Sequence, residues 1–434
     1  MGYADEWLRF APKPRDLKAP QKYHVFLSYR SVNRIWVLNL YDVLRLQGFE
    51  VFLDQVRLTG GDELIRKLEE GLAQSQAGIL IWSSASADSS WVTREYQTLE
   101  RQADEHKSFK FIPVQLDGSP LPEFVKNRVF LDFSSYPDGP NGGELLRLLY
   151  SITGQPLSPE AARFGAEQDA LARQQANEIE AAIFNNDADR LQELFASGGL
   201  PWHTTSALGC KAADGLVKLD RKTEAIAMLE KLKLRFPQAI RPQQLHALAL
   251  ARRAQGNDLR DAQRILGPLY IGGQRDPETI GIYARTWMDR FALSGARTDL
   301  EQSRNLYAEA FDLATDDYYT GINAAAKSVL LGTPEDLDRA REYADRVQEI
   351  VGVTPRQGDY WRTATIGQLL LIKKNYRDAA SVYKAGVAMA LSQVASHRTS
   401  WLQAYRLMEK LQPSAEERAL VRNAFAHLPE DPEP

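Results

Sequence analysis

Short apolar segments alternate with amphipathic stretches through the N-terminal part of the 434-residue chain, and this alternation constrains the fold more than any other feature. Between residues 21 and 154, runs rich in β-forming residues are separated by stretches whose apolar residues recur at helical spacing. Strands that alternate with helices of this length imply βαβ crossovers and a parallel sheet. The expected strands cover residues 23–27, 49–53, 78–82, 109–116 and 129–133.

The rest of the chain, from about residue 166, shows no convincing strand and reads as helices. Within it, small residues recur at intervals of 37 to 41 residues, which is the range of helix-pair repeats. This pattern predicts a solenoid of stacked helical hairpins, and a non-repetitive helical bundle is the alternative. The recurring residues are Ala225, Ala262, Ser303, Ala340 and Ala379.

These patterns divide the chain into four segments. Residues 1–20 are expected to be an N-terminal arm, since Pro12, Pro14 and Pro20 oppose a helix there. Residues 21–154 form the α/β domain and residues 155–165, which contain prolines, a linker. Residues 166–430 form the helical-repeat domain.

Composition excludes several classes of protein. A formal net charge of −4 argues against a nucleic-acid binder, which normally carries a basic excess. The apolar runs are much shorter than the roughly 20 residues that cross a bilayer, and the first twenty residues lack a secretory signal. A single cysteine, Cys210, permits neither an internal disulfide nor a zinc cluster, so we expect no metal site and a cytoplasmic location.

Ligands of open parallel sheets bind beyond the carboxyl ends of the strands, so the polar residues that follow each strand are candidates. The segment Phe26-Leu-Ser-Tyr-Arg-Ser31 ends the first strand and opens a helix. Tyr29 offers a stacking face and Arg30 a phosphate donor, while Ser31 can cap the helix beside an anion. A plain strand end with a helix cap is the alternative.

Two further polar segments follow strands. Asp54 ends the second strand and precedes a loop that contains Gly60 and Gly61, which is suited to a hinge or a contact surface. The third strand leads through Ser83 into a serine-rich segment and then a helix with Trp91 and Glu95 on one face, four residues apart. A solvated glutamate and a core tryptophan are the alternatives for that pair.

Read together and in register, the three segments resemble a TIR domain over about residues 22–154. Phe26-Leu-Ser-Tyr-Arg resembles the first box of the family, and Gly48-Phe-Glu-Val-Phe-Leu-Asp54 with the following loop resembles its second strand and mobile loop. The segment from Ser83 to Glu95 resembles the one that carries the catalytic glutamate of the enzymatic members. The resemblance implies a flavodoxin-like fold with a five-stranded parallel sheet.

The enzymatic members of the family cleave the N-glycosidic bond of NAD+, which implies the same activity here, with NAD+ as substrate and no other cofactor. Nicotinamide leaves as a neutral molecule, so the main demand is to stabilise the oxocarbenium-like ribose. A carboxylate beside the ribose meets that demand electrostatically, and the resemblance assigns it to Glu95. The substrate-binding residues implied with it are Phe26, Tyr29, Arg30, Ser31, Asp54, Arg57, Ser83 and Trp91.

The helical half resembles the TPR-like, TRAF-binding-type regulatory domain of stress-pathway kinases and its bacterial relatives, over about residues 200–410. Concave solenoid surfaces usually bind peptides, proteins or nucleotides. Tyr318, Tyr319 and Asn323 are candidates for such a groove, and packing between helices is the alternative.

We therefore expect an NAD+ nucleosidase (EC 3.2.2 type) that releases nicotinamide and either ADP-ribose or a cyclic ADP-ribose. Its activity would be controlled by the helical domain, through an unknown protein or small-molecule activator, and by TIR self-association, in bacterial immune or antiphage signalling. The alternative is a non-catalytic TIR adaptor that acts through protein contacts. A Rossmann dehydrogenase is disfavoured, because no Gly-x-Gly-x-x-Gly motif follows the first strand.

Overall fold

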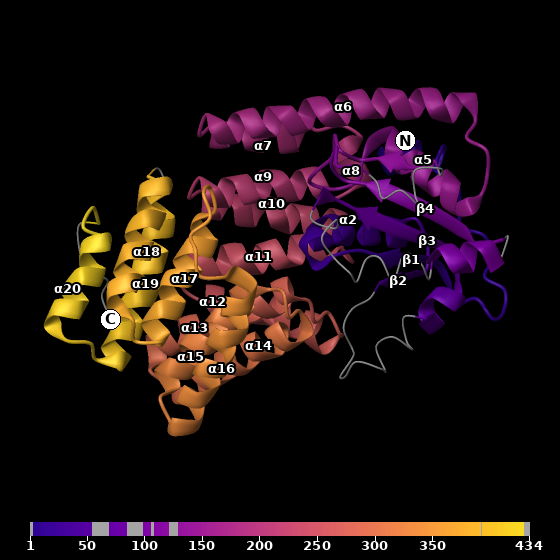
Figure 1. The fold of residues 1–434 in the computed structure, drawn as a ribbon. Coiled ribbons are helices and arrows are strands. Elements are labelled where there is room, and N and C mark those ends of the chain that lie inside the picture. The colour runs from indigo at the N-terminus through magenta and orange to yellow at the C-terminus, as the bar shows by residue number, and fades with distance from the viewer. Residues whose placement is uncertain are drawn as a thin grey trace. The chain divides into compact units, whose positions relative to one another are not determined.

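A five-stranded parallel sheet forms the centre of the N-terminal part of the protein (Figure 1). The computed structural model describes residues 3–53, 69–84, 99–105, 108–120, 129–391 and 393–428. The strand order is β2-β1-β3-β4-β5, which is the flavodoxin-like order and confirms the predicted sheet. The strands are β1 Tyr23–Ser28, β2 Val51–Leu53, β3 Ser75–Trp82, β4 Lys110–Gln115 and β5 Leu131–Asp132.

The strands are apolar on both faces because helices cover both sides of the sheet. Val25 and Leu27 point into a core formed with helices α2 (Arg34–Leu46) and α5 (Gly142–Thr153). Phe26, between them, points to the opposite face and packs in a second cluster with Trp82. This alternation follows from the two-residue period of a strand. Residues 69–73 and 99–105, which are helical, contribute Leu72 and Leu99 to the second cluster.

The N-terminal residues include a short helix, α1 (Tyr3–Leu8), rather than an arm without helix. The helix ends before Pro12, so the prolines limit its length without preventing it. Trp7 is 2% exposed and belongs to the core of the sheet domain, and the ring of Phe10 stacks on Phe164 at 4.2 Å between centroids. The apolar side chains of this segment therefore anchor it to the fold.

In the described part of the chain after α5, every regular element is a helix. The first of them, α6, begins at Pro159, inside the segment expected to be a linker, because Ser158 caps it and proline suits its first turn. The helices are α6 Pro159–Phe184, α7 Ala188–Ser197, α8 Pro201–Thr204, α9 Ala207–Lys218, α10 Lys222–Arg235, α11 Ile240–Arg253, α12 Asp258–Ile271, α13 Pro277–Ser294, α14 Arg297–Leu313, α15 Tyr318–Leu331, α16 Pro334–Val351, α17 Tyr360–Ile372, α18 Tyr376–Met389, α19 Val394–Leu411 and α20 Ala415–Ala424.

The small residues that recur in the sequence lie near the starts of alternate helices, α10, α12, α14, α16 and α18. All are at most 1% exposed, so a larger side chain at any of them would meet a neighbouring helix. This placement confirms the predicted helical-repeat region. The residues are Ala225, Ala262, Ser303, Ala340 and Ala379.

The chain separates into two compact units, Met1–Ile265 and Leu266–Pro434. In the first unit, helix α6 packs directly on α5, where a Cβ added to Gly143 would lie 2.8 Å from the backbone of Gly165. Two glycines therefore allow a close approach between α5 and α6. Ala161, Phe164 and Ala172 of α6 belong to the same hydrophobic core as the sheet.

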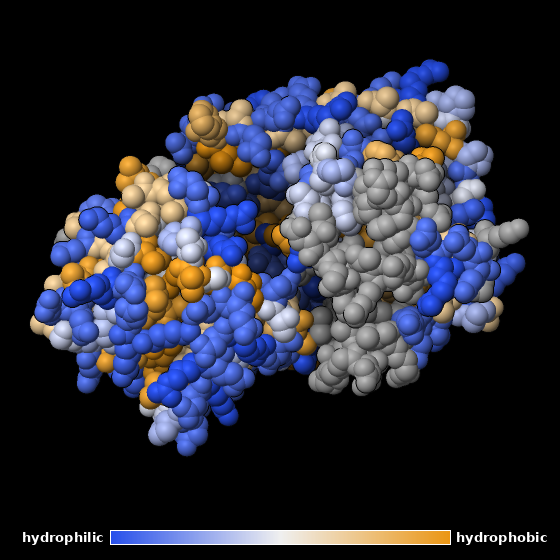
Figure 2. All heavy atoms as spheres, viewed as in Figure 1, coloured by the Kyte–Doolittle hydropathy of each residue, from blue (hydrophilic) through white to orange (hydrophobic). Residues whose placement is uncertain are grey.

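The second unit consists of packed helical hairpins with their own core, built around residues such as Phe311, Tyr383 and Phe425. On its visible face, Figure 2 shows apolar residues gathered among hydrophilic ones. Exposed large apolar residues in this unit include Tyr319 and Trp361, at 48% and 47%. In the described part of the chain, no helix combines the length and the apolar character that a membrane span requires.

Candidate functional site

The carboxyl ends of β1 and β3 form the switch point of the sheet, where β2 and β3 lie on opposite sides of β1. The side chain of Asn33 from the 3-10 helix η1 (Ser31–Asn33) bonds to Ser83, which follows β3, with Nδ2 donating to Oγ at 3.1 Å. The hydroxyl of Ser83 also lies 3.1 Å from Oδ1 of Asn33. Because this amide is engaged with Ser83, Asn33 occupies the N-cap of α2 without capping it through its side chain.

The segment after β1 places two predicted residues at this edge. Tyr29 and Arg30 are half buried, and the guanidinium of Arg34 lies 5.9 Å from the centre of the Tyr29 ring. Phe26, in contrast, is 3% exposed, and its ring stacks on Phe52 at 5.3 Å between centroids. Phe26 thus forms part of the core beneath the edge. Ser31 begins η1 between these residues and α2.

A carboxylate stands at the end of the neighbouring strand β4. Oδ2 of Asp117 accepts a hydrogen bond from the backbone N–H of Ser84 at 2.8 Å, and Ser119 donates to Oδ1 through both its N–H and its hydroxyl. Burial alone would raise the pKa of Asp117, but these hydrogen bonds outweigh it and lower the pKa below its usual value. Asp117 is therefore an anion that fixes the start of the segment after β3.

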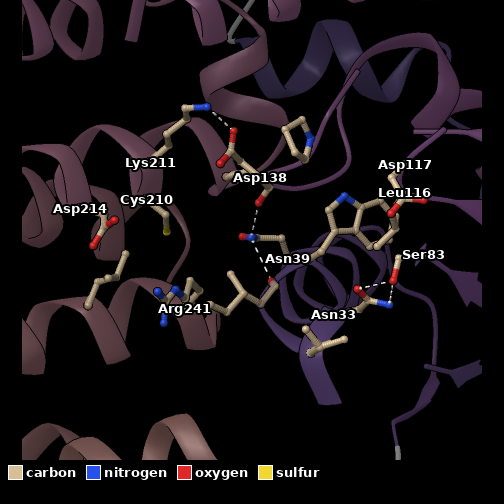
Figure 3. Close-up of a pocket in the computed structure, with 16 residues that line it drawn as sticks. Asn33, Asn39, Ser83, Leu116, Asp117, Asp138, Cys210, Lys211, Asp214 and Arg241 are labelled. Carbon is tan, nitrogen blue, oxygen red and sulfur yellow. Dashed lines mark hydrogen bonds and ion pairs between the residues drawn. The ribbon is translucent and has the colours of Figure 1, made fainter. Parts of the chain in front are cut away.

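A cleft of about 430 Å³ opens at this edge of the sheet (Figure 3). Its volume lies in the range of small-molecule sites, about 300–1,000 Å³. One wall comes from η1, α2 and the segments after β3, β4 and β5, and the other from α9 and α11. The lining residues are Val32, Asn33, Ile35, Trp36, Asn39, Ser83, Leu116, Asp117, Pro137, Asp138, Ala207, Cys210, Lys211, Asp214, Arg241 and Leu245.

Charged groups join the two walls of the cleft. The ammonium of Lys211 on α9 forms ion pairs with Asp138 and, at 2.6 Å, with Glu180 on α6. Burial would lower the pKa of Lys211, but the two carboxylates outweigh it and raise the pKa. On the same α9, Cys210 is buried, and burial raises the pKa of its thiol to about 12. Cys210 is thus an unreactive packing residue and no nucleophile.

Polar contacts continue along α2, which lies between the sheet and the helices. The amide of Asn39 donates to the carbonyl of Asp138 at 3.0 Å and accepts a hydrogen bond from the hydroxyl of Ser206 at 3.2 Å. One turn later, Asp42 accepts a hydrogen bond from the backbone N–H of Ile240, the first residue of α11, at 3.0 Å. The starts of α9 and α11 are therefore docked on α2, the helix that follows η1 at the candidate site.

Four predicted site residues, Asp54, Arg57, Trp91 and Glu95, lie outside the described residues, so their roles stay predictions. The chain positions on either side are nonetheless described. Ser84 lies at the edge of the sheet and precedes the segment that carries Trp91 and Glu95, while Leu53 ends β2 directly before Asp54. Of the remaining predicted residues, Tyr29, Arg30 and Ser83 are brought to one edge of the sheet.

Sequence reasoning missed several residues of this cleft. Asp117 follows a predicted strand, so the rule that selected Asp54 would also have selected it. Asn33 lies two residues after Ser31 and could have been identified as a polar residue at a helix start. Lys211 and Arg241 come from distant helices, and no local pattern marks them as neighbours of the sheet.

Two protein-family models match parts of the chain. Residues 25–148 match the family model described as TIR domain, and residues 221–331 match the model described as Tetratricopeptide Repeats-Sensor. These matches confirm the two predicted resemblances, to a TIR domain and to a TPR-like helical region. They cover separate parts of the chain.

The chain is also similar to relatives of known description over stretches of 84 to 100 residues. The probable 2' cyclic ADP-D-ribose synthase TcpB of Brucella melitensis is 34% identical over 84 residues, which are 19% of this chain and 34% of that protein. The 2' cyclic ADP-D-ribose synthase BtTIR of Bacteroides thetaiotaomicron is 33% identical over 95 residues, 21% of this chain and 33% of the relative. The NAD(+) hydrolase TcpA of a Theionarchaea archaeon is 28% identical over 100 residues, 23% and 30% of the two chains.

The chain spans about a third of the length of these relatives. Among solved structures, the crystal structure of yeast Tom70 aligns with a TM-score of 0.39 and 11% identity, over 96% of this chain and 71% of that one.

Proposed function

Because residues 25–148 are a TIR domain, we propose that this protein cleaves the bond between nicotinamide and ribose in NAD+. The observation that carries the proposal is the similarity of this chain to relatives described as cyclic ADP-D-ribose synthases and an NAD(+) hydrolase. The polar edge at the switch point of the sheet supports it, since ligands of this fold bind there.

In this proposal, Glu95 stabilises the positive charge that develops on the ribose as nicotinamide leaves. No general acid is required, because nicotinamide departs from a cationic ring as a neutral molecule. Tyr29 and Arg30, which follow β1, hold the substrate, the tyrosine through its ring and the arginine through a phosphate. Ser83 contributes through the hydrogen bonds that keep its hydroxyl at Asn33.

The proposed product depends on which nucleophile attacks the anomeric carbon. Attack by water gives ADP-ribose, and attack from within the same ADP-ribosyl group gives a cyclic ADP-ribose. The names of the relatives include both outcomes, a cyclic synthase and a hydrolase. We therefore propose the common first step, release of nicotinamide, and leave the two products to the assay.

We further propose that the helical part controls this activity and that TIR self-association promotes it, in bacterial immune or antiphage signalling. The support for control is physical: α6 shares the core of the sheet domain, and α9 and α11 form one wall of the cleft. A change in how these helices dock would therefore alter the site directly.

The test is release of nicotinamide from NAD+ by the purified full-length chain, dilute and concentrated, followed by chromatography of the products. We expect Glu95→Gln to lower the rate by about 100-fold or more, as is typical when one charge-stabilising group is removed. The matched control is Glu105→Gln, which changes an exposed glutamate at the end of the same predicted helix and should keep the wild-type rate.

A different result would contradict the proposal. If the wild-type chain releases no nicotinamide at any concentration, or if Glu95→Gln retains full activity, the catalytic assignment is wrong. Self-association of the chain without turnover would then favour the non-catalytic adaptor.

A further inference from the structure

A cluster of cationic side chains lies on one face of two neighbouring helices in the second unit. On α13, Arg285 and Asp289 are four residues apart, and on α15, Asn323 and Lys327 have the same spacing, so each pair shares a helix face. The two faces meet, because a Cβ added to Gly281 would lie 3.4 Å from the ring of Tyr319. The ring of Tyr319 on α15 therefore packs against α13 at position 281.

Lys327 is the buried member of the cluster, with 7% of its surface exposed. Its ammonium donates to Oδ1 of Asn323 at 2.6 Å and lies 5.1 Å from the centre of the Tyr307 ring. The amide of Asn323 is oriented for this role, since its Nδ2 donates to the carbonyl of Tyr319 at 2.9 Å. Both of these partners of Lys327 are neutral, so neither compensates its charge.

The nearby charges are mostly positive. Arg285 on α13 and Arg406 on α19 both act on Lys327, and Asp289 is the carboxylate among these groups. Burial, together with the two arginines, lowers the pKa of Lys327 to about 7. Burial also raises the pKa of Asp289, despite the neighbouring Arg285. The lowered pKa of Lys327 has the direction expected beside other positive charges, whereas the raised pKa of Asp289 is due to burial, which outweighs the neighbouring cations.

The ion pair between Arg285 and Asp289 is a weak one. Nε of Arg285 lies 3.5 Å from Oδ2 of Asp289, longer than the about 2.7–2.9 Å of a good charge-assisted hydrogen bond. The side chain of Arg285 retains 39% exposure, and Tyr319 beside it is 48% exposed. A charged group and an aromatic ring are thus accessible from solvent next to a buried ammonium.

We propose that this face of the second unit binds a phosphate-bearing small molecule, with Arg285, Lys327 and Arg406 contacting the phosphate and Tyr319 contacting a flat organic part. Arginine and lysine are the side chains that recognise phosphate oxygens, and a guanidinium can do so through two parallel hydrogen bonds. An anion at this place adds negative charge beside Lys327, where Asp289 is the carboxylate among the charged groups that act on it, while Glu278 and Asp317 act on Tyr319. The exposed ring of Tyr319 gives a nucleotide an apolar surface that a bare phosphate does not need.

The sequence offered a ligand groove and packing between helices as alternatives for this region, and the exposure of its residues differs. Asn323 is 4% exposed and holds Lys327, so it is a packing residue that also orients the ammonium. Tyr319 is half exposed, so it can contact a ligand. The inference goes beyond NAD+ cleavage, because none of these residues belongs to the sheet domain.

The experiment measures binding of ADP, inorganic pyrophosphate and adenosine to the full-length chain by calorimetry. Hydrogen–deuterium exchange of peptides from α13 and α15 then reports whether the ligand binds at the second unit. We expect ADP and pyrophosphate to bind and to protect these peptides, and adenosine, which has no phosphate, to leave them unprotected.

Two variants test the assignment of residues. Arg285→Gln and Lys327→Met should each weaken binding of ADP to the second unit by about tenfold or more, as expected for one charged hydrogen bond. Arg341→Gln, which changes a 66% exposed arginine on α16, is the control and should bind within twofold of wild type. Arg285 is half exposed, so its replacement preserves the fold even if that of Lys327 does not.

The proposal is overturned if neither ADP nor pyrophosphate protects α13 and α15 at millimolar concentration. It is equally overturned if both cluster variants bind like wild type. Because the readout is exchange within the second unit, it is independent of whether the chain cleaves NAD+.

Discussion

The packing of α11 on α2 can be tested through the protonation state of the Asp42 carboxyl group. Its Oδ2 accepts the backbone N–H of Ile240 at 3.0 Å, in the first turn of α11. Burial raises the pKa of Asp42 from 3.8 to about 8, and the hydrogen bonds from the backbone of Ile240 and Arg241 and the charge of Arg45 offset this only in part. At neutral pH the docked state therefore keeps Asp42 protonated.

The effect on stability follows from the difference in proton binding. A chain with α11 undocked releases this proton above about pH 4, whereas the docked state holds it up to about pH 8. Docking therefore weakens as pH rises between these values, by up to about 1.4 kcal/mol per pH unit. Between pH 5 and 7 the loss is up to about 2.7 kcal/mol, or about 100-fold in the opening equilibrium.

Asp42→Asn removes the proton but keeps a carbonyl that can accept the N–H of Ile240. We expect the protection of the Ile240 and Arg241 amides in the variant, relative to wild type, to increase by about 10- to 100-fold from pH 5 to pH 7. Hydrogen–deuterium exchange measures this ratio at each pH, and the intrinsic exchange rates cancel because the substitution is distant in sequence. Asp189→Asn, at a carboxylate with 83% side-chain exposure on α7, is the control. A ratio that stays constant within about threefold would refute the reasoning.

Two simpler perturbations test the first unit. Gly143→Ala places a Cβ 2.6 Å from Asp169 and 2.8 Å from the backbone of Gly165, so α5 and α6 must separate; we expect a loss of about 1–3 kcal/mol in urea denaturation, and no loss would show that the two helices adjust freely. Cys210, with a buried thiol of pKa about 12, should resist iodoacetamide at pH 7.5 in the folded chain and react after unfolding; rapid labelling of the native protein would contradict its burial.

The sheet could be predicted from the sequence because each of its strands carries a local signal. Residues 23–27 and 78–82 are short, mainly apolar runs, which is typical of a strand covered on both faces, and both lie within observed strands. The repeated small residues of the helical part were also visible locally, since a spacing of 37 to 41 residues is a property of the sequence alone. Both signals can be recognised in the order of residues, without knowledge of the contacts between distant segments.

The cleft could be predicted only in part, because half of it depends on contacts between distant segments. Tyr29, Arg30 and Ser83 follow strands, so the sheet rule locates them. Lys211 and Asp138 are 73 residues apart in sequence, and Asp42 and Ile240 are 198 apart. Within its own helix, Asp42 reads as a solvent-facing residue of an amphipathic pattern, and only the packing of α11 makes it buried.

The continuity of the core between the sheet and α6 limits how this protein can be divided or recombined. A fragment that ends at residue 154 loses Ala161, Phe164 and Ala172 and exposes the apolar surface that they cover, including that of Trp7. Such a fragment would be prone to aggregate, and a chimera that joins this sheet domain to a foreign helical domain has to carry α6 along. The sheet domain and α6 are thus joined by packed side chains rather than by a flexible tether.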